Sequence, residues 1–169
     1  GPTLMAPPPT GSWVPYGLRT ETQNLPGFIV LVPKGMPVAG SDNWQSSFLP
    51  GSLQGTYIET QGRKPSELIE HVRNPLLTPT EQRAQLSFLQ HLNRSHLAKR
   101  GEPSLEARIH GFETAFRMQT EATDAFDIDR EPQHIRDLYG DSPQARQLLI
   151  ARRLVERGVR YVQVWHGNS

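Results

Sequence analysis

Residues 27–33, with the sequence GFIVLVP, decide the fold class of this 169-residue chain. Five apolar residues follow one another without a polar interruption, and Pro26 and Pro33 bound the run. A continuous apolar run, as opposed to alternating apolar and polar residues, is typical of a strand that is buried on both faces. Such strands occur in parallel sheets covered by helices, so we predict an α/β fold.

Two other segments are predicted strands. VRYVQVWH at residues 159–166 is a second clear strand, and GTYIET at residues 55–60 is a short candidate. Both clear strands have the composition of strands buried on both faces, so each requires neighbouring strands that this chain hardly supplies. We therefore expect the chain to contribute part of a larger, mostly parallel sheet flanked by helices, and to be an internal portion of a longer protein.

A helix is predicted immediately before the last strand, over residues 142–157. Ser142 is the expected N-cap and Pro143 the first helical position, and Gly158 ends the helix. A helix joined to a strand through one glycine is a common connection in α/β proteins. Apolar spacing predicts that the buried face of this helix is formed by Leu148, Ala151 and Val155.

The chain is expected to hold a lead-in at residues 1–26 and one partial α/β domain at residues 27–169. APPPTGSW, at residues 6–13, excludes a helix on local grounds and predicts an extended lead-in. Within the domain, residues 34–64 lack periodicity and are predicted to form a long irregular loop, of a length that is often functional. The helices are predicted within residues 65–157.

These helices include one with a strong start signal. Thr78 and Glu81 have the spacing of a capping box. Residues 104–120 are the clearest amphipathic helix, with apolar residues at helical spacing. The basic run NRSHLAKRG at residues 93–101 falls at a helix end, where basic side chains compensate the helix dipole. The other helices are predicted at residues 65–74, 78–101 and 131–140.

Composition narrows the function classes. The chain has 18 basic and 17 acidic residues, a formal net charge of +1, which gives no support for a nucleic-acid partner. It contains no cysteine, which excludes disulfides, thiolate metal sites and cysteine nucleophiles. No run approaches the roughly 18 apolar residues of a membrane span, and no stretch of the sequence has the pattern of a signal peptide.

His166 is the ionisable residue best placed for function. It lies at the carboxyl end of a predicted strand, the edge at which α/β sheets bind ligands, and Gly167 and Asn168 after it allow a tight turn. A role as ligand for a metal or an anionic substrate and a structural role, with the imidazole bonded to backbone, both remain open. The other histidines have no metal-binding spacing; they are His71, His91, His96, His110 and His134.

The irregular segment at residues 34–64 holds the second group of candidates. Trp44, Ser46 and Gln54 combine an aromatic side chain with polar ones, as in a pocket for a polar ligand. Trp44 can equally anchor the loop as a buried side chain, together with Phe48 and Leu49, and the sequence favours neither interpretation. No base is adjacent to a serine there, so a nucleophilic serine is not supported.

An acidic run at residues 122–131 invites a calcium site. It contains Asp124, Asp127 and Asp129 but lacks the glycine and distal glutamate of an EF-hand loop. A solvated acidic turn before a helix is the preferred interpretation. The sequence also contains no HExxH, GxSxG, Walker or GxGxxG motif.

Several stretches, in this order, resemble the bacterial "domain of unknown function 1501" family. NLPGFIVL at residues 24–31 and IARRLVERGVRYV at residues 150–162 are the most specific parts of the resemblance, which covers nearly the whole chain. Members of this family are sulfatase-like proteins of the alkaline phosphatase superfamily. The stretches that carry the resemblance are residues 12–31, 48–58, 107–120, 130–140 and 148–168.

The resemblance implies a metal-dependent hydrolase of sulfate or phosphate esters with an alkaline phosphatase-like sheet. It implies a divalent metal (Ca, Zn or Mg) that polarises the ester, and export to the periplasm. The family's aspartate and nucleophile on an N-terminal strand, and its later metal ligands, have no counterpart in this sequence. His166 and Asn168 are therefore expected to be neighbours of the site, and the remainder of the same polypeptide is the expected partner.

The sequence and its resemblance to this family suggest two possible functions. The first is a portion of a sulfatase-like hydrolase of sulfate or phosphate esters, not catalytically complete alone. The second is a non-catalytic binding or structural protein on a degenerate scaffold of the same kind. An Asp closely followed by Ser, Thr or Cys on an upstream strand, with Asp and His pairs downstream, favours the enzyme.

Overall fold

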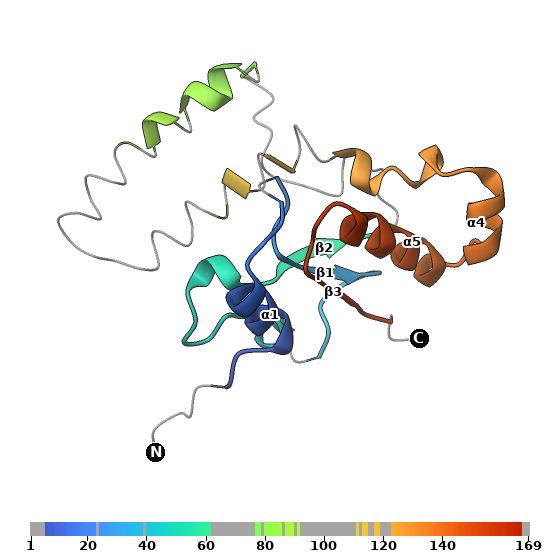
Figure 1. Ribbon diagram of the computed structural model, residues 1–169, viewed down its shortest axis with the longest axis horizontal. Coiled ribbons are helices and arrows are strands. Elements are labelled where there is room, and N and C mark those ends of the chain that lie inside the picture. Colours follow the sequence, from blue (N-terminus) through green and yellow to red (C-terminus); the bar gives the residue numbers. More distant parts are fainter. Residues whose placement is uncertain are drawn as a thin grey trace.

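The computed structural model describes residues 6–22, 24–38, 40–61, 77–78, 80–85, 87–89, 91, 111, 113–114, 117–118 and 123–166. A small parallel sheet lies at its centre, with helices on both sides (Figure 1). In chain order the elements are α1 (Thr10–Leu18), β1 (Phe28–Val32), the 3-10 turns η1 (Gly40–Asn43) and η2 (Gly51–Leu53), β2 (Thr56–Glu59), η4 (Thr123–Phe126), η5 (Ile128–Arg130), α4 (Gln133–Tyr139), α5 (Pro143–Glu156) and β3 (Tyr161–Val164).

The sheet confirms the predicted α/β class. Its three strands are all parallel, in the order β2-β1-β3, so that β1 is central. All five residues of β1 are buried, as their continuous apolar character predicts. The residues of β3 are each only partly buried. Burial on both faces was therefore predicted correctly for β1 and wrongly for β3, which has one neighbouring strand within the described part of the chain.

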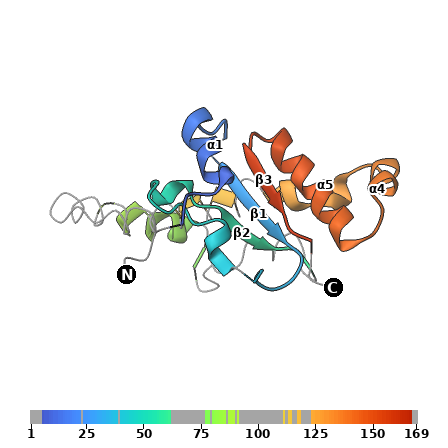
Figure 2. The same ribbon diagram turned by 90° about the horizontal axis from the view of Figure 1, so that it is seen from below.

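Alternate residues of β1 point to two separate clusters. Ile29 and Leu31 join a core formed with α5 and the turns η4 and η5. Phe28, Val30 and Val32 face the other way, toward Trp44. Helix α1 covers this second face, because Gly11 lies directly against the ring of Phe28, where a Cβ would overlap it. Figure 2 shows α1 and α5 on opposite sides of the strands.

The predicted helix at residues 142–157 is present as α5, but its buried face is not the predicted one. The Oγ of Ser142 accepts a hydrogen bond from the N–H of Ala145 at 3.1 Å, which confirms the N-cap. Gly158, with a φ of 89°, turns the chain toward β3. However, Leu148 and Val155 are exposed and Ala151 is only partly buried. The buried residues of α5 are Ala145, Gln147, Leu149, Ile150, Arg153 and Leu154.

The error has a physical reason. Two polar residues, Gln147 and Arg153, occupy the buried side of α5, whereas Leu148 and Val155 face solvent. A prediction from apolar periodicity places the most hydrophobic residues inside. Because the buried residues here include polar ones, the predicted face is rotated from the observed face by about one residue, or about 100°. Both buried polar side chains therefore require an explanation other than the hydrophobic effect.

The prediction that residues 6–13 cannot be helical is wrong, because α1 begins at Thr10. The prolines before it stand outside the helix, where their missing N–H groups cost nothing. Ser12 donates its backbone N–H to the carbonyl of Pro9 at 2.9 Å, which closes the first turn. Gly11, Ser12 and Pro15 are buried. Tertiary packing on the sheet thus stabilises a helix that local propensity disfavours.

Parts of the other predicted helices are described. Thr78 and Glu81 form the predicted capping box, and the hydrogen bonds from Thr78 hold the pKa of Glu81 below its usual range. The helix predicted at residues 131–140 is α4, with Gly140 as its C-cap. The predicted helix at residues 65–74 and the basic run at residues 93–101 lie outside the described residues, as does most of the helix predicted at residues 104–120.

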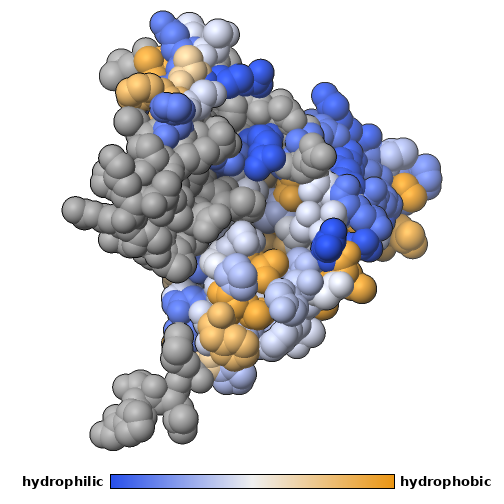
Figure 3. Space-filling view, turned by 60° about the vertical axis from the view of Figure 1, so that its left-hand side comes forward, coloured by the Kyte–Doolittle hydropathy of each residue, from blue (hydrophilic) through white to orange (hydrophobic). Residues whose placement is uncertain are grey.

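On the face that Figure 3 shows, apolar side chains lie in patches between hydrophilic residues. One group of aromatic side chains joins α1 to residue 48: the ring of Trp13 lies 5.6 Å from Tyr16 and 5.9 Å from Phe48, centroid to centroid. All three of these side chains are exposed. None of the helices described is both long and apolar enough to cross a membrane.

Candidate functional site

A cavity of about 630 Å³ opens at the carboxyl edge of the sheet. This size lies within the range of roughly 300–1,000 Å³ that is usual for small-molecule sites. Strand β1 runs directly into its wall, β3 ends at it, and the N-terminus of α5 borders it. The lining residues are Val32, Pro33, Lys34, Gly35, Met36, Pro37, Val38, Asn43, Gln61, Ser142, Pro143, Gln144, Gln147, Trp165 and His166.

The topology explains why these residues meet. All three strands are parallel, so the segments that follow them emerge at one edge. The main-chain N–H of Trp165 donates to the carbonyl of Leu31 at 2.9 Å, which holds the end of β3 against the end of β1. Helix α5 precedes β3 and runs antiparallel to it, which places Ser142 and Pro143 at the same edge. This is the location at which open α/β sheets generally bind ligands.

The charge of the lining favours an anion. Lys34 and His166 are its ionisable side chains, and no lining residue is an Asp or Glu. The first turn of α5 adds the positive end of a helix dipole. Pro143 has no N–H, and the N–H of Ala145 bonds the Oγ of Ser142. Asp141 precedes Ser142 in the chain but is not part of the lining.

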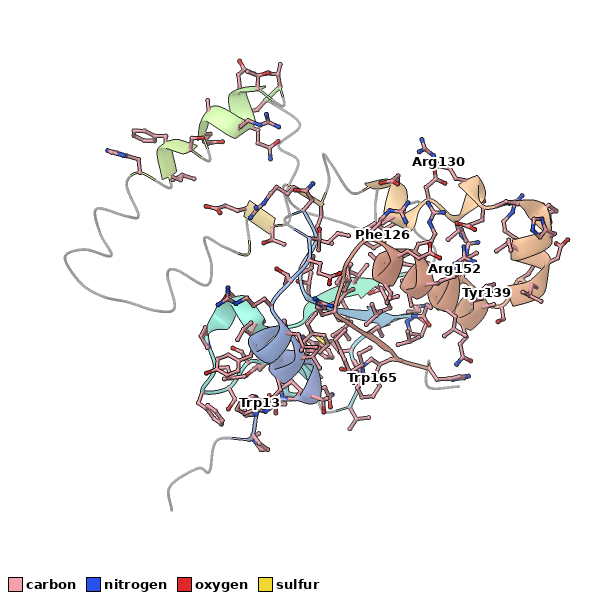
Figure 4. All side chains as sticks on the ribbon, in the orientation of Figure 1. Trp13, Phe126, Arg130, Tyr139, Arg152 and Trp165 are labelled. Carbon is pink, nitrogen blue, oxygen red and sulfur yellow. The ribbon has the colours of Figure 1, made fainter. Side chains whose placement is uncertain are left out.

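Two buried polar groups of the lining lack hydrogen-bond partners. Both the Oε1 and the Nε2 of Gln147 are unpaired, and the residue has no exposed surface. The Nε1 of Trp165 is also buried and unpaired. Buried donors and acceptors without partners are rare in folded proteins, because each costs about 1–3 kcal/mol. Figure 4 shows Trp165 beyond the end of β3, apart from Arg152 and Tyr139.

The candidates predicted from the sequence do not come together. His166 lines the cavity and is exposed, whereas Asn168 lies outside the described residues. Gln54 precedes β2, so it lies at the amino edge of the sheet, about 20 Å from His166 along the strand direction at about 3.3 Å per residue. The predicted site group is therefore divided between the two edges.

Trp44 and Ser46 are both buried in this fold. The ring of Trp44 is buried in the second cluster and stacks on Tyr57, with centroids 5.4 Å apart. Its carbonyl accepts the N–H of Gly55 at 2.9 Å. Ser46 is buried, and its carbonyl accepts the N–H of Leu49. The alternative in which Trp44 and Leu49 anchor the loop is thus supported, while Phe48 is exposed.

Sequence reasoning missed the residues that give the cavity its character. Lys34, Gln147 and Trp165 were not singled out, and Ser142 was identified only as a helix cap. A signal was present for two of them. Lys34 directly follows the predicted first strand, and Trp165 precedes His166 at the end of the last one. Gln147 had no local signal, because its burial depends on how α5 is rotated against the sheet.

The opposite end of α5 carries a second polar group. Each side-chain nitrogen of Arg153 has an acceptor there, whereas the Nε of Arg152 is buried without a hydrogen bond and lies 3.2 Å from Glu156. Arg153 donates to Glu131 and to the carbonyls of Asp124 and Ala125, the latter two at 2.6 and 3.2 Å. Arg152 also donates to Glu131, and this bond, with that from Arg153, holds the pKa of Glu131 below its usual range. These contacts join η4 and η5 to α5.

The acidic run belongs to this ion-pair network. Asp124 bonds Arg157 at 2.7 Å, Asp127 lies 3.3 Å from Arg130, and Asp129 lies 3.4 Å from Arg136. The hydrogen bond from Arg157 lowers the pKa of Asp124. Each carboxylate therefore faces a different arginine, which supports a structural turn and not a calcium site.

The described residues lack the ligand set that a divalent metal such as calcium or zinc requires. Calcium takes six to eight oxygen ligands, and catalytic zinc sites use three protein ligands. Across the described part of the chain, no group of three His, Asp or Glu side chains is arranged to hold a metal ion. The cavity lining provides one imidazole, that of His166, and no carboxylate. The described residues therefore do not fit a complete divalent-metal site.

Comparison with known families identifies the group to which the chain is related. The chain belongs to the family described as "protein of unknown function (DUF1501)", which matches residues 1–168. The resemblance found in the sequence is thereby confirmed at the level of the family. Searches of curated proteins and of solved structures found no match to this chain.

Proposed function

We propose that this chain is one portion of a sulfatase-like hydrolase of sulfate or phosphate esters. In this proposal it supplies the wall of the site that binds the anionic group of the ester. The nucleophile and the metal ligands are supplied by residues other than those that the structure describes. The chain alone is then not catalytically complete.

The observation that carries the proposal is the charge of the carboxyl-edge cavity. Lys34, His166 and the N-terminus of α5 meet there, and the lining contains no carboxylate that would repel an oxyanion. Sulfate and phosphate groups are oxyanions that helix N-termini and lysine side chains commonly bind. The position at the carboxyl edge of a parallel sheet supports an active site in particular.

A second candidate function is a non-catalytic binding protein on the same scaffold. It is favoured by the lining itself, in which His166 is the single side chain of a type that commonly binds divalent metals. Under this alternative the cavity binds an anion, but no ester is cleaved. Both candidate functions predict that the cavity binds an anion, but only the hydrolase predicts that an ester is cleaved.

The test is an ester hydrolysis assay of the complete reading frame that encodes this chain. Hydrolysis of 4-nitrophenyl sulfate and 4-nitrophenyl phosphate is measured with added Ca²⁺, Zn²⁺ or Mg²⁺, and again after EDTA. We expect EDTA-sensitive turnover of at least one ester by the complete protein and none by the 169-residue chain alone. Anion binding without turnover by the complete protein, under every metal, selects the binding function instead.

Ser142 provides a matched pair of variants that isolates the anion. Asp and Asn both cap helices about as well as Ser, so Ser142→Asp and Ser142→Asn are expected to keep α5 intact. The Asp variant places a negative charge at the cavity, and we expect its KM to rise about tenfold, corresponding to about 1.4 kcal/mol. The KM of the Asn variant should stay within about twofold of that of the unaltered protein. Equal KM values for both variants would show that this cavity does not bind the anionic group of the ester.

A further inference from the structure

The unpaired polar atoms of Gln147 and Trp165 restrict the chemistry of a ligand more than the charge of the cavity does. The Gln147 amide presents a donor, Nε2, and an acceptor, Oε1, side by side and buried. Trp165 adds a second donor, Nε1, from the end of β3. A ligand that satisfies all three atoms must offer at least one donor and two acceptors, with one donor next to one acceptor.

Most ligand classes fail this requirement. An oxyanion accepts from Nε2 and Nε1, but it has no proton for Oε1 of Gln147 and sets lone pairs against lone pairs there. A single trans peptide group fails, because its N–H and C=O point in opposite directions and cannot reach one side-chain amide together. The N–H and C=O of one extended residue do lie side by side, so an extended peptide is a competing ligand. An apolar ligand satisfies none of the three. The oxyanion and the Gln147 amide therefore belong to different parts of the ligand.

Adjacent hydroxyl groups meet the requirement. Each hydroxyl is both donor and acceptor, so one of a vicinal pair donates to Oε1 while its neighbour accepts from Nε2. The other lining residues suit the carbon side of such a group, since Val32, Met36 and Val38 are apolar. A purine edge also has an adjacent donor and acceptor. Bases, however, bind chiefly by stacking on aromatic faces, and Trp165, the lining's one indole or phenyl ring, packs against the second cluster.

We propose that the cavity binds a sugar ring, or an equally hydroxylated group, through the Gln147 amide and the indole N–H of Trp165. The inference rests on the proposed function in one respect, because the sugar is taken to be the alcohol part of the ester. Lys34 and the N-terminus of α5 then hold the anionic group, and Gln147 and Trp165 hold the hydroxyl groups.

The experiment is an NMR titration of the ¹⁵N-labelled 169-residue chain with separate probes. The probes are neutral methyl glycosides of several monosaccharides, sodium sulfate and adenosine. The signals observed are the three indole N–H groups, with Trp165 assigned through Trp165→Phe, and the side-chain amide of Gln147. We expect at least one glycoside to shift the Trp165 indole and Gln147 amide signals, while the indole signals of Trp13 and Trp44 stay in place.

Two variants test the assignment. Gln147→Leu keeps the volume of the side chain and removes both polar atoms. We expect it to weaken glycoside binding by at least about five- to tenfold, because two neutral hydrogen bonds are lost. Gln54→Leu makes the same change at the opposite edge of the sheet and should leave binding within about twofold. Since Leu relieves unpaired polar atoms, the Gln147 variant is expected to fold.

The outcomes separate this inference from the proposed function. Shifts by sulfate alone, with none by any glycoside, overturn the sugar site and leave the anion proposal standing. Shifts by adenosine that Gln147→Leu abolishes, without shifts by glycosides, also overturn it, in favour of a base-binding site. Glycoside binding by a chain whose complete protein hydrolyses no ester supports the sugar site and overturns the hydrolase. Equal glycoside affinity of Gln147→Leu and the unaltered chain overturns the role of Gln147.

Discussion

The two ends of α5 bury polar side chains in opposite ways. Near its C-terminus, Arg153 donates to Glu131 and to two backbone carbonyls, and its donors are matched by acceptors. Near its N-terminus, Gln147 is fully buried with neither polar atom paired. The same helix thus carries one polar residue that is satisfied within the chain and one that is not. The first stabilises the packing of η4 and η5, whereas the second lines the cavity.

The difference distinguishes buried polar side chains that stabilise the fold from those that are available to a ligand. Folded proteins pair almost all buried polar groups, since an unpaired one costs stability. Unpaired groups that persist beside a cavity are therefore expected to find their partners in a ligand or in bound water. Replacing Arg153 by an apolar residue should therefore lower the free energy of unfolding, whereas replacing Gln147 should raise it. Only the replacement of Gln147 should also weaken ligand binding.

The largest effect is expected at the paired end. Arg153→Leu removes one of the two charges that Glu131 faces, since Arg152 remains, and leaves the carbonyls of Asp124 and Ala125 without their donor. Breaking a buried, hydrogen-bonded ion pair from one side costs about 3 kcal/mol of unfolding free energy. Chemical denaturation measures the change. Arg146→Leu, an exposed arginine of the same helix, serves as the control and should stay within about 0.5 kcal/mol.

A smaller effect of the opposite sign is expected at the unpaired end. Gln147→Leu replaces two orphaned polar atoms by methyl groups in a buried position, so we expect the unfolding free energy to rise by about 1–2 kcal/mol. The measurement is again chemical denaturation, with Gln54→Leu as the exposed control. A loss of stability would show that Gln147 has partners within the protein and that the contrast between the two ends does not exist.

The comparison also explains which features the sequence reveals. The continuous apolar run of β1 and the cap at Ser142 are local signals, and both predictions were confirmed. The face of α5 was predicted wrongly because Gln147 and Arg153 replace apolar residues on the inside of the helix. One is held there by an ion pair with residues more than 20 positions away, and the other lines the cavity. Apolar periodicity contains neither kind of information.

The same reasoning applies to the candidate site. His166 was found because the carboxyl end of a strand is recognisable in the sequence. Gln54 was grouped with it, although the parallel pairing of Ile29 with Thr56 places Gln54 at the other edge. The strand register decides which loops meet, and it follows from pairing between distant segments. A single sequence therefore indicates the edge of a sheet more readily than the set of loops that meet there.

Ser142 offers a change of intermediate size at the cavity itself. Ser142→Ala removes the acceptor of the Ala145 N–H and should lower the unfolding free energy by about 1 kcal/mol. Because the cap also orients the first turn, sulfate binding by the chain should weaken together with stability. Ser142→Asn restores a capping acceptor and should recover both. Recovery of stability without recovery of sulfate binding by the Asn variant would show that the hydroxyl contacts the anion directly.

The smallest effect concerns the pH dependence of the paired end. Arg152 and Arg153 hold the pKa of Glu131 below its ordinary value of 4.5, so the ionised pair stabilises the fold above that pH. This contribution is lost as the pH falls from about 4.5 through the lowered pKa of the folded state, because protonation then breaks the pair.

Glu131→Gln cannot titrate, so its unfolding free energy should fall less between pH 5 and pH 3 than that of the unaltered chain. Asp124, whose pKa Arg157 also lowers, titrates in both proteins and therefore cancels from the difference between them. Asp137→Asn removes a carboxylate of α4 that bonds Gln133 instead of an arginine, and serves as the control. Denaturation curves at several pH values measure the slopes. If Glu131→Gln and Asp137→Asn have the same slope, the arginines do not stabilise the ionised form of Glu131, and the paired end of α5 is held by packing alone.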